Sequence, residues 1–458
     1  MDKNRRDFLK MVGAGAALGA LASCGVKVSD DKPKENVATG EMTYRTNHNT
    51  GDEVSLLGYG MMRLPTIKKT DGDNEVEVLD QEGINRLVDY AIEHGVNYFD
   101  TAPVYCQGKS EEATGIALSR HPRDKYFIAT KLSNFSPDSQ TREASMQMFE
   151  NSLKNLRTDY IDYLLLHAIG GGGMPALNQR FIDNGILDYL VEQKKAGRIR
   201  NLGFSFHGEI EVFDTMMKWM DEGKVHWDFV QIQLNYIDWN GSKEVRNRNV
   251  DAEYLYKELE KRDIPAVIME PLLGGRLAKV PGSISEKMKE KRPDDSIASW
   301  AFRFAGTPKG VLTVLSGMTY MEHLQDNLKS YSPLVPIDEA EDAFLRDCAL
   351  MYKTAELIPC TECQYCMPCP FGIDIPGNFA HYNKCINDNY IAWDTRDPNY
   401  DKARRAYLVS YDRAIPKSRQ ADRCISCGVC QPQCPQEIKI PRQLAKIAAY
   451  TASLLAQK

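Results

Sequence analysis

The chain has 458 residues, of which 43% are hydrophobic and 26% are charged, so it is long enough to bury the core of one large or two unequal domains. Its formal net charge of -6 and its lack of a basic tract argue against nucleic acid as a partner. No uncharged apolar run reaches the length that spans a bilayer.

The first residues have the layout of a bacterial export signal of the twin-arginine type. Arg5 and Arg6 precede an uncharged, apolar run over residues 11–23, although an asparagine stands before them where Ser or Thr is usual. The run ends in Leu-Ala-Ser followed by Cys24, which resembles the lipobox of bacterial lipoproteins. We therefore expect residues 1–23 to be an export signal, and the exported protein to be lipid-anchored through Cys24 at the periplasmic face of the cytoplasmic membrane.

A polar and aperiodic stretch follows the predicted signal. From Val28 to Arg45 it consists mainly of charged and polar residues, which is typical of a flexible linker. We therefore predict a spacer over residues 24–50, with ordered structure beginning near Val54.

Eight β-rich runs then alternate with amphipathic helical patterns. In residues 82–95, for example, apolar residues recur at helical spacing and Gly95 ends the pattern. Alternation of strands with helices favours a parallel sheet, and eight units match a closed (β/α)8 TIM barrel, which we predict over residues 51–335. The predicted strands are 55–64, 96–102, 126–132, 160–168, 199–207, 228–236, 266–271 and 311–318.

Side chains capable of catalysis stand at the ends of three successive predicted strands, where such barrels carry their chemistry. Asp100 and Tyr105 lie in the segment Asp-Thr-Ala-Pro-Val-Tyr, Lys131 follows a threonine, and His167 ends the run Leu-Leu-Leu-His. This constellation resembles the aldo-keto reductase family, and these four residues match its catalytic tetrad. The resemblance extends from about residue 52 to 330 and implies interconversion of a carbonyl and an alcohol.

These four groups can together support the reduction of a carbonyl. Reduction of a carbonyl by hydride requires a proton for the developing alkoxide, and a phenol with a pKa of about 10 donates it poorly unless a cation lies nearby. Lys131 is the candidate cation, Asp100 would keep it charged and oriented, and His167 would bind the substrate oxygen. A single such residue is more often structural, but four at neighbouring strand ends favour an active site.

The resemblance also implies a nicotinamide nucleotide. Ser205 and Gln231 would hold the carboxamide of the nicotinamide, and Asp326 with Asn327 would reach the adenine end.

Several positions depart from the family pattern at this nucleotide site. Phe206 replaces the usual asparagine, and Met269 stands where better-known members place an aromatic ring on the nicotinamide. Gly317 and His323 stand where lysine and arginine bind the 2′-phosphate of NADP. Because a phosphate without such partners loses charge-assisted hydrogen bonds, the sequence leaves NAD and NADP equally open.

Eight of the twelve cysteines form two blocks in a predicted C-terminal domain over residues 336–458. The second block has the ferredoxin spacing C-x2-C-x2-C-x3-C-P, in which the fourth cysteine binds the other of two clusters. The first block is one residue shorter before its last cysteine. On the ferredoxin rule, one cluster takes Cys360, Cys363, Cys366 and Cys434, and the other takes Cys424, Cys427, Cys430 and Cys369.

Zinc knuckles and disulfides are the competing interpretations of these cysteines. Neither accounts for a third two-residue step and a Cys-Pro pair in both blocks, so we expect two 4Fe-4S clusters in a small ferredoxin-like domain. Cys348 and Cys385 are expected to be buried thiols. The segment 375–420, between the blocks, is expected to form helices that pack on the barrel.

The whole chain resembles ferredoxin-tailed members of the aldo-keto reductase family. We expect an oxidoreductase acting on a small carbonyl or alcohol substrate, with a sugar-like molecule among the candidates, whose clusters relay electrons to a membrane partner. Two alternatives remain open. One is an electron-transfer iron–sulfur protein whose barrel is a non-catalytic scaffold, and the other is a reductase whose clusters only brace the C-terminal domain.

Overall fold

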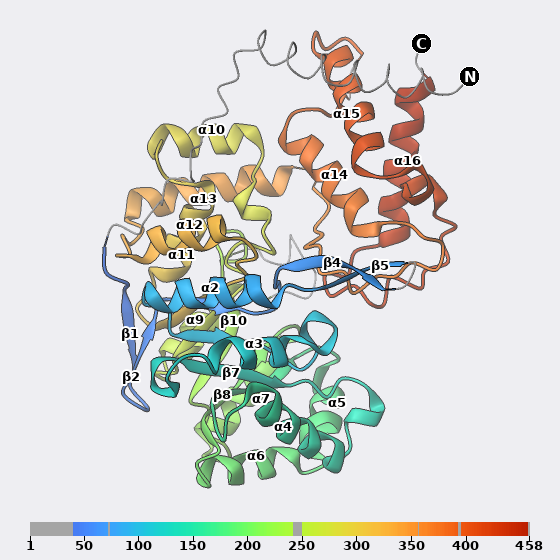
Figure 1. Ribbon diagram of the computed structural model, residues 1–458. Coiled ribbons are helices and arrows are strands. Elements are labelled where there is room, and N and C mark those ends of the chain that lie inside the picture. The colour runs from blue at the N-terminus through green and yellow to red at the C-terminus, as the bar shows by residue number, and fades with distance from the viewer. Residues whose placement is uncertain (1–39, 72–73, 241–249, 356, 393–394, 457–458) are drawn as a thin grey trace, which may run out of the picture. The chain divides into compact units, whose positions relative to one another are not determined.

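A computed structural model describes residues 40–458, apart from 72–73, 241–249, 356, 393–394 and 457–458 (Figure 1). The predicted export signal, Cys24 and residues 25–39 of the predicted spacer lie outside the described residues. The remainder of the predicted spacer differs from the expectation, because it contains strand β1 (Tyr44–Asn47), which pairs with β2 (Asp52–Ser55) in an antiparallel hairpin. Regular structure therefore begins before Val54.

Eight parallel strands close into a barrel, which confirms the predicted fold class. Each predicted β-rich run covers one of these strands, except that β8 extends one residue beyond its run, to Ile169, and neighbours in the chain are neighbours in the barrel. The strands are β3 (Leu57–Gly60), β6 (Tyr98–Asp100), β7 (Phe127–Leu132), β8 (Ile161–Ile169), β9 (Ile199–Phe206), β10 (Phe229–Gln233), β11 (Ala266–Met269) and β12 (Val311–Ser316).

Helices surround this barrel (Figure 1). Helix α2 illustrates their origin, because its N-cap Asp80 accepts a hydrogen bond from the backbone of Gly83 and its apolar stripe is buried against the strands. The helices that follow the strands are α2 (Gln81–Glu93), α3 (Ser110–Leu118), α4 (Arg142–Leu156), α6 (Ile186–Lys195), α7 (Ile210–Asp221), α9 (Ala252–Glu260), α10 (Gly282–Lys291), α11 (Ile297–Gly306) and α12 (Met321–Tyr331).

Two hairpins and a helical insertion decorate the barrel. The β1–β2 hairpin contributes Asn47, which is fully buried and donates to Tyr163 Oη (3.1 Å) and to Asn201 Oδ1 (3.2 Å) near the starts of β8 and β9. It therefore closes the end of the barrel opposite to the strand ends that carry the chemistry. Strands β4 (Thr66–Asp71) and β5 (Asn74–Leu79) form the second hairpin, and the segment after β8 contains α5 (Gly173–Leu177) and a π-helical turn, η4 (Asn178–Ile182).

The C-terminal region has its own core. Helix α13 (Glu339–Thr354) leads from the barrel, and α14 (Ile375–Asn387), α15 (Tyr400–Ala414) and α16 (Ile440–Ala456) pack together (Figure 1). The buried apolar side chains of α14, α15 and α16 form a cluster that is separate from the core of the barrel, to which α13 contributes. The helices expected between the cysteine blocks are thus present, but they bury their apolar faces mainly against one another and α16, because the barrel's own helices already cover its strands.

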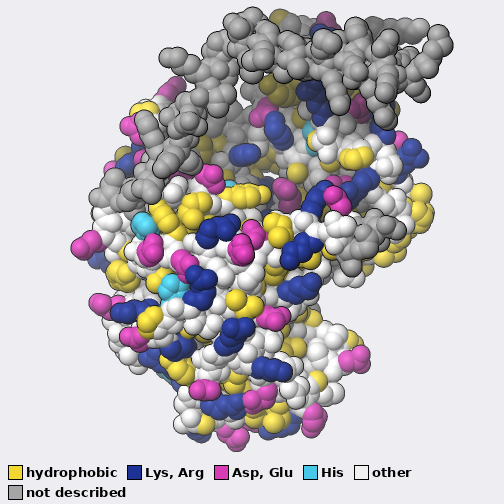
Figure 2. Space-filling model, viewed as in Figure 1, with side chains coloured by type: hydrophobic (Ala, Val, Ile, Leu, Met, Phe, Trp, Pro, Cys, Tyr) yellow, Lys and Arg dark blue, Asp and Glu magenta, His cyan; other side chains and the backbone are white. Residues whose placement is uncertain are grey.

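The displayed face of the barrel carries both signs of charge. Lysine and arginine side chains are interspersed with aspartate and glutamate over this face (Figure 2). Among the residues that the structure describes, no helix has the length and apolar character needed to cross a membrane.

Candidate active site

The structure brings the four predicted catalytic residues together at one end of the barrel. Asp100 is the last residue of β6, while Lys131 and His167 lie near the ends of β7 and β8. These three strands are consecutive in the barrel, so their carboxyl ends meet at one edge. Tyr105 lies in a short 3-10 turn, η1 (Tyr105–Gly108), that follows β6.

Lys131 and Asp100 form a buried ion pair. Lys131 Nζ lies 2.6 Å from Asp100 Oδ1 and donates also to the carbonyl oxygen of Thr101 at 2.8 Å. The two side chains are almost inaccessible, at 2% and 4% exposure. Burial lowers the pKa of Lys131 and raises that of Asp100, and the pair opposes both shifts. The lysine is therefore held in one place by two acceptors.

Tyr105 lies near both this pair and the histidine. Lys131 Nζ is 4.9 Å from the centroid of the Tyr105 ring, and the Tyr105 and His167 rings are 5.9 Å apart in an edge-on arrangement. Burial, and then the negative charges of Asp100 and Glu270, raise the pKa of Tyr105 well above its usual value. The phenol is therefore protonated at neutral pH, as a proton donor must be.

His167 is oriented by a residue that the sequence did not single out. Its Nδ1 lies 2.6 Å from the hydroxyl oxygen of Ser133, which follows β7 directly. Burial, and then the nearby cation of Lys131, lower the pKa of His167 well below its usual value, so the imidazole is neutral. The half-exposed ring of Phe135 lies 5.0 Å from the imidazole, which leaves an apolar wall beside it.

Arg180 is a second unanticipated residue at this site, and it comes from the π-helical turn η4. Its guanidinium donates to the carbonyl oxygens of His167 (2.6 Å) and Ala168 (3.3 Å), and it stacks over Phe135 at 4.6 Å. Ala168 has a left-handed backbone, with φ of 54°, where the register of β8 with β9 shifts. Arg180 therefore stabilises the irregular strand end that presents the histidine.

The two residues predicted to hold a nicotinamide carboxamide are direct neighbours across two strands. Ser205 on β9 and Gln231 on β10 are paired in register, and both are buried. Ser205 Oγ accepts a hydrogen bond from the backbone of Ala168 at 2.8 Å, so its own proton is free to be donated. Gln231 Oε1 is buried without a hydrogen-bond partner. A carboxamide, which needs one donor and one acceptor, fits this pair.

The residues predicted to lie at the adenine end of the nucleotide do not form a buried pair as Ser205 and Gln231 do. Asn327 is buried and donates to Ser316 Oγ at 2.8 Å, whereas Asp326 and His323 lie nearer the surface. Beside Gly317 the structure places the side chain of Arg63, from the segment after β3. The aliphatic stem of Arg63 therefore lies beside this position, while its guanidinium donates to the carbonyl oxygen of Thr361.

The other departures from the family pattern have simple structural explanations. Phe206 is buried and packs against Phe213 of α7 at 5.2 Å, so it is a core residue. Met269, at the end of β11, is only partly buried. The next residue, Glu270, has a left-handed backbone with φ of 55° and a buried carboxylate oxygen, Oε2, without a hydrogen-bond partner. Nothing in the sequence pattern pointed to this carboxylate beside Tyr105.

The cysteines form two groups that mix the two blocks. One pocket is lined by Cys360, Cys363, Cys366 and, from the second block, Cys434. Cys430 interacts electrostatically with its neighbours Cys424 and Cys427 and with Cys369 of the first block. The structure thus places Cys434 beside the first three cysteines of the first block, and Cys369 near Cys430 of the second block, in line with the crossing arrangement.

The thiols are not arranged as ligands of a single ion. Over the described part of the chain, no three His, Cys, Asp or Glu side chains converge as such ligands would, and the cysteines there are free thiols. A cubane makes no such demand, because each thiolate binds a different iron atom. Cys348 and Cys385 are buried, as predicted, at 1% and 2% exposure.

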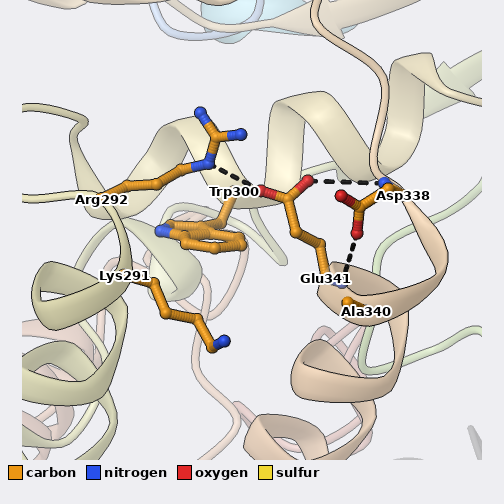
Figure 3. Close-up of a pocket in the computed structure, with 6 residues that line it drawn as sticks. All are labelled: Lys291, Arg292, Trp300, Asp338, Ala340 and Glu341. Carbon is orange, nitrogen blue, oxygen red and sulfur yellow. Dashed lines mark hydrogen bonds and ion pairs between the residues drawn. The ribbon is translucent and has the colours of Figure 1, made fainter.

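A separate surface pocket lies between the end of α10, helix α11 and the start of α13 (Figure 3). Arg292 pairs with Glu341 at 2.7 Å, and Glu341 pairs also with Arg303 at 2.6 Å. Its charged groups stabilise one another, and it contains none of the predicted site residues. Its lining residues are Lys291, Arg292, Trp300, Asp338, Ala340 and Glu341.

Comparison with protein families identifies a family for the barrel and another for the cysteine-rich region. A model of the aldo/keto reductase family matches residues 56–343, and a model of the 4Fe-4S dicluster domain matches residues 359–438. Among curated proteins, the uncharacterized oxidoreductase YqkF of Bacillus subtilis is 26% identical over 306 residues, which cover 61% of this chain and 87% of that protein. L-galactose dehydrogenase of Arabidopsis thaliana is 23% identical over 302 residues, covering 62% and 87%.

Solved structures show the same barrel. The holo form of aldo-keto reductase AKR11C1 from Bacillus halodurans aligns with a TM-score of 0.53 at 21% identity, over 67% of this chain and 96% of that one. An aldo-keto reductase from Klebsiella pneumoniae in complex with NADPH aligns with a TM-score of 0.51 at 20% identity, over 69% and 96%. At these identities the likeness establishes the fold.

Proposed function

Because the chain belongs to the aldo/keto reductase family, we propose that it reduces the carbonyl group of a small molecule to an alcohol, with Tyr105 as the proton donor. The observation that carries this proposal is the assembled tetrad. Lys131 Nζ lies 2.6 Å from Asp100 and 4.9 Å from the centroid of the Tyr105 ring, and the ring of His167 lies 5.9 Å from that of Tyr105. A barrel that served only as a non-catalytic scaffold would not require these four groups to be held in this arrangement. The arrangement therefore favours a catalytic barrel.

In the proposed reaction, Tyr105 and His167 bind the carbonyl oxygen of the substrate. With the Ser133 hydroxyl donating to Nδ1, the other ring nitrogen of His167 carries its proton and donates to that oxygen. Tyr105 transfers its phenolic proton to the oxygen as hydride reaches the carbon, and the charge of Lys131 stabilises the resulting phenolate.

A nicotinamide nucleotide, when bound, supplies the hydride that the protein's own side chains cannot. Its carboxamide would be held by Ser205 and Gln231, and Asp326 and Asn327 would lie toward its adenine end.

We also propose that two 4Fe-4S clusters are held by the two cysteine groups. The first takes Cys360, Cys363, Cys366 and Cys434, and the second takes Cys424, Cys427, Cys430 and Cys369, as their juxtaposition supports. The clusters, when bound, would carry single electrons, a function separate from the two-electron hydride transfer to the carbonyl. The test is the visible spectrum of anaerobic protein before and after NADPH or NADH. Bleaching supports electron flow from nucleotide to iron, whereas an unchanged band that dithionite still bleaches favours clusters that only brace the domain.

The catalytic proposal is tested by the conservative substitution Tyr105→Phe. We expect kcat for carbonyl reduction to fall by about 10²- to 10⁴-fold, since the donor's proton is lost. Iron and sulfide content should stay at the wild-type level, because Tyr105 lies in the barrel. Turnover at the wild-type rate would remove the tetrad from the mechanism.

Export with a lipid anchor at Cys24 is a further part of this proposal, supported by the twin-arginine and lipobox patterns of residues 1–24. We expect wild-type protein in the membrane fraction to incorporate labelled fatty acid. The Cys24→Ala variant should lose the label and leave that fraction. Equal labelling of the two proteins would overturn the anchor assignment.

A further inference from the structure

The first cysteine block makes contact with the end of the barrel that carries the tetrad. Thr361 is 4% exposed and lines the pocket that four cysteines share, namely Cys360, Cys363, Cys366 and Cys434. Its side chain lies against Gly274, after β11, where an added Cβ would meet Thr361 Cβ and Cγ2 at 2.4 Å. The φ of 70° at Gly274 also favours glycine. The wall of this cysteine pocket therefore rests directly on the barrel.

A cation of the barrel binds the same threonine. Arg63, which is partly buried in the segment after β3, donates from its guanidinium to the carbonyl oxygen of Thr361. The hydroxyl of Thr319 donates to the carbonyl oxygen of Arg63 at 2.8 Å, and the aliphatic stem of Arg63 lies beside Gly317, so this residue is held from the barrel side. Within the described part of the chain, no carboxylate forms an ion pair with the guanidinium. Its positive charge therefore acts on Thr361 without being neutralised by an acidic side chain.

The peptide unit that Arg63 binds also reaches a thiol. The carbonyl of Thr361 and the N–H of Glu362 belong to one planar peptide, and this N–H donates to Cys360 Sγ at 3.4 Å. Glu362 has a left-handed backbone, with φ of 55°. Because a hydrogen bond at one end of a peptide polarises the other end, the guanidinium strengthens the N–H···S bond. A continuous hydrogen-bonded relay thus joins Arg63 of the barrel to Cys360, a predicted iron ligand.

Such a relay bears on the redox chemistry of a cluster at this site. Reduction adds one negative charge to iron that four thiolates already surround. Hydrogen bonds to the sulfur ligands and nearby positive charge stabilise the reduced form, and so raise the reduction potential. Charges interact more strongly where water is excluded, and Thr361 is almost inaccessible. Arg63 would therefore favour an electron on the cluster that faces the barrel.

We propose that Arg63 is a redox-tuning residue, which raises the reduction potential of one 4Fe-4S cluster through the peptide of Thr361 and Glu362. The cluster concerned is the one held by Cys360, Cys363, Cys366 and Cys434. The barrel thereby sets the electron affinity of the cluster that it touches, and no cysteine of the second group belongs to the relay. The inference rests on the proposed clusters and goes beyond them, and it does not depend on carbonyl reduction.

The test is an anaerobic redox titration of the full holoenzyme, followed by electron paramagnetic resonance. Arg63→Met removes the charged donor and keeps an unbranched side chain beside Gly317. We expect the equilibrium constant for reduction of one cluster to fall about tenfold, which corresponds to ~59 mV for a one-electron couple, while that of the other cluster changes less than twofold. Arg63→Lys, which keeps the charge, should recover more than half of the shift. Arg346→Met is the matched control, because it removes an exposed arginine of α13, and it should match wild type.

Two ligand variants identify which cluster responds. In Cys427→Ser, which should lack the second cluster, Arg63→Met should still produce the shift. In Cys434→Ser, which should lack the first cluster, the same substitution should produce none. Amide hydrogen exchange supplies a readout that needs no redox change. Peptides that contain Glu362 should exchange faster in Arg63→Met than in wild type at equal iron content, because the N–H···S bond is weakened, whereas Arg346→Met should leave their exchange unchanged.

The outcomes that overturn this inference differ from those that overturn the proposed function. Shifts below twofold at both clusters, or equal shifts of both, would show that the relay does not tune the first one. So would a shift in Arg346→Met as large as that in Arg63→Met, since net charge alone would then account for it. If wild-type protein binds no iron, the proposed clusters fail as well. A protein that reduces no carbonyl but shows the selective shift leaves the inference standing and removes only the proposed reaction.

Discussion

The barrel and the cysteine-rich region build their sites in opposite ways. In the barrel, Asp100 and Lys131 are 4% and 2% exposed and are fixed by a close-packed core. In the cysteine-rich region the eight candidate ligands lie on segments without regular structure, and Cys427 is exposed. Burial raises the pKa of the Cys360 thiol to about 12, although an iron ligand must be a thiolate. The first site is organised by packing, whereas the second needs its metal to become organised.

Removal of the clusters is expected to have the largest effect on this difference between the barrel and the cysteine-rich region. Anaerobic chelation of iron should abolish the hydrogen-exchange protection of α14 and α16, because their small core is joined through the cysteine segments. The barrel strands should keep their protection, since their core contains no cysteine ligand. Mass spectrometry of exchanged peptides measures both regions at once. Simultaneous loss of protection in the barrel would refute the contrast.

The next largest expected effect is on the stability of the barrel, when its buried ion pair is broken. Lys131→Met leaves Asp100 buried without its partner, so the free energy of unfolding should fall by about 3–5 kcal/mol. The double variant Lys131→Met with Asp100→Asn should recover most of that loss, because no uncompensated charge remains, while activity stays absent. Denaturant unfolding and carbonyl reduction measure the two properties. If the double variant is no more stable than the single one, the pair is not the source of the loss.

A smaller effect is expected at the predicted carboxamide site. Gln231→Leu removes the buried, unpartnered Oε1, so KM for the nucleotide should rise by about 3- to 10-fold, which corresponds to one hydrogen bond. Thermal stability should not fall, because no internal partner of that oxygen is lost. Gln147→Leu on α4 is the control. An unchanged nucleotide KM would place the nicotinamide elsewhere.

The smallest expected effect is that of pH on kcat/KM for reduction. His167 has a pKa well below 6.5 in the folded protein, so it stays neutral as the pH falls from 8 to 6. Since Tyr105 has a raised pKa and remains protonated over the same range, kcat/KM for reduction should be flat there, and an acid limb should appear only below the range where a free histidine titrates. A loss of activity centred near pH 6.5 would mean that His167 is solvated.

Much of the fold and of the site followed from local patterns. The eight strands appear where β-rich runs alternate with helical ones, since each run must bury apolar side chains on both faces of a parallel sheet. Asp100, Tyr105, Lys131 and His167 were found because strand ends in a barrel converge. The β1–β2 hairpin was missed because its strands are short and polar, and Asn47 becomes buried only through partners 116 and 154 residues away.

The sequence by itself determined the barrel, the four residues at its strand ends and the two cysteine blocks, because periodicity and spacing are local properties of the chain. Only the tertiary structure decided which distant groups share the site. Arg180 and Ser133 orient His167, Arg63 lies beside Gly317, and Thr361 of the first cysteine block accepts a hydrogen bond from Arg63. Such contacts join residues far apart in the chain, and they depend on how separately folded segments pack rather than on any pattern within one of them.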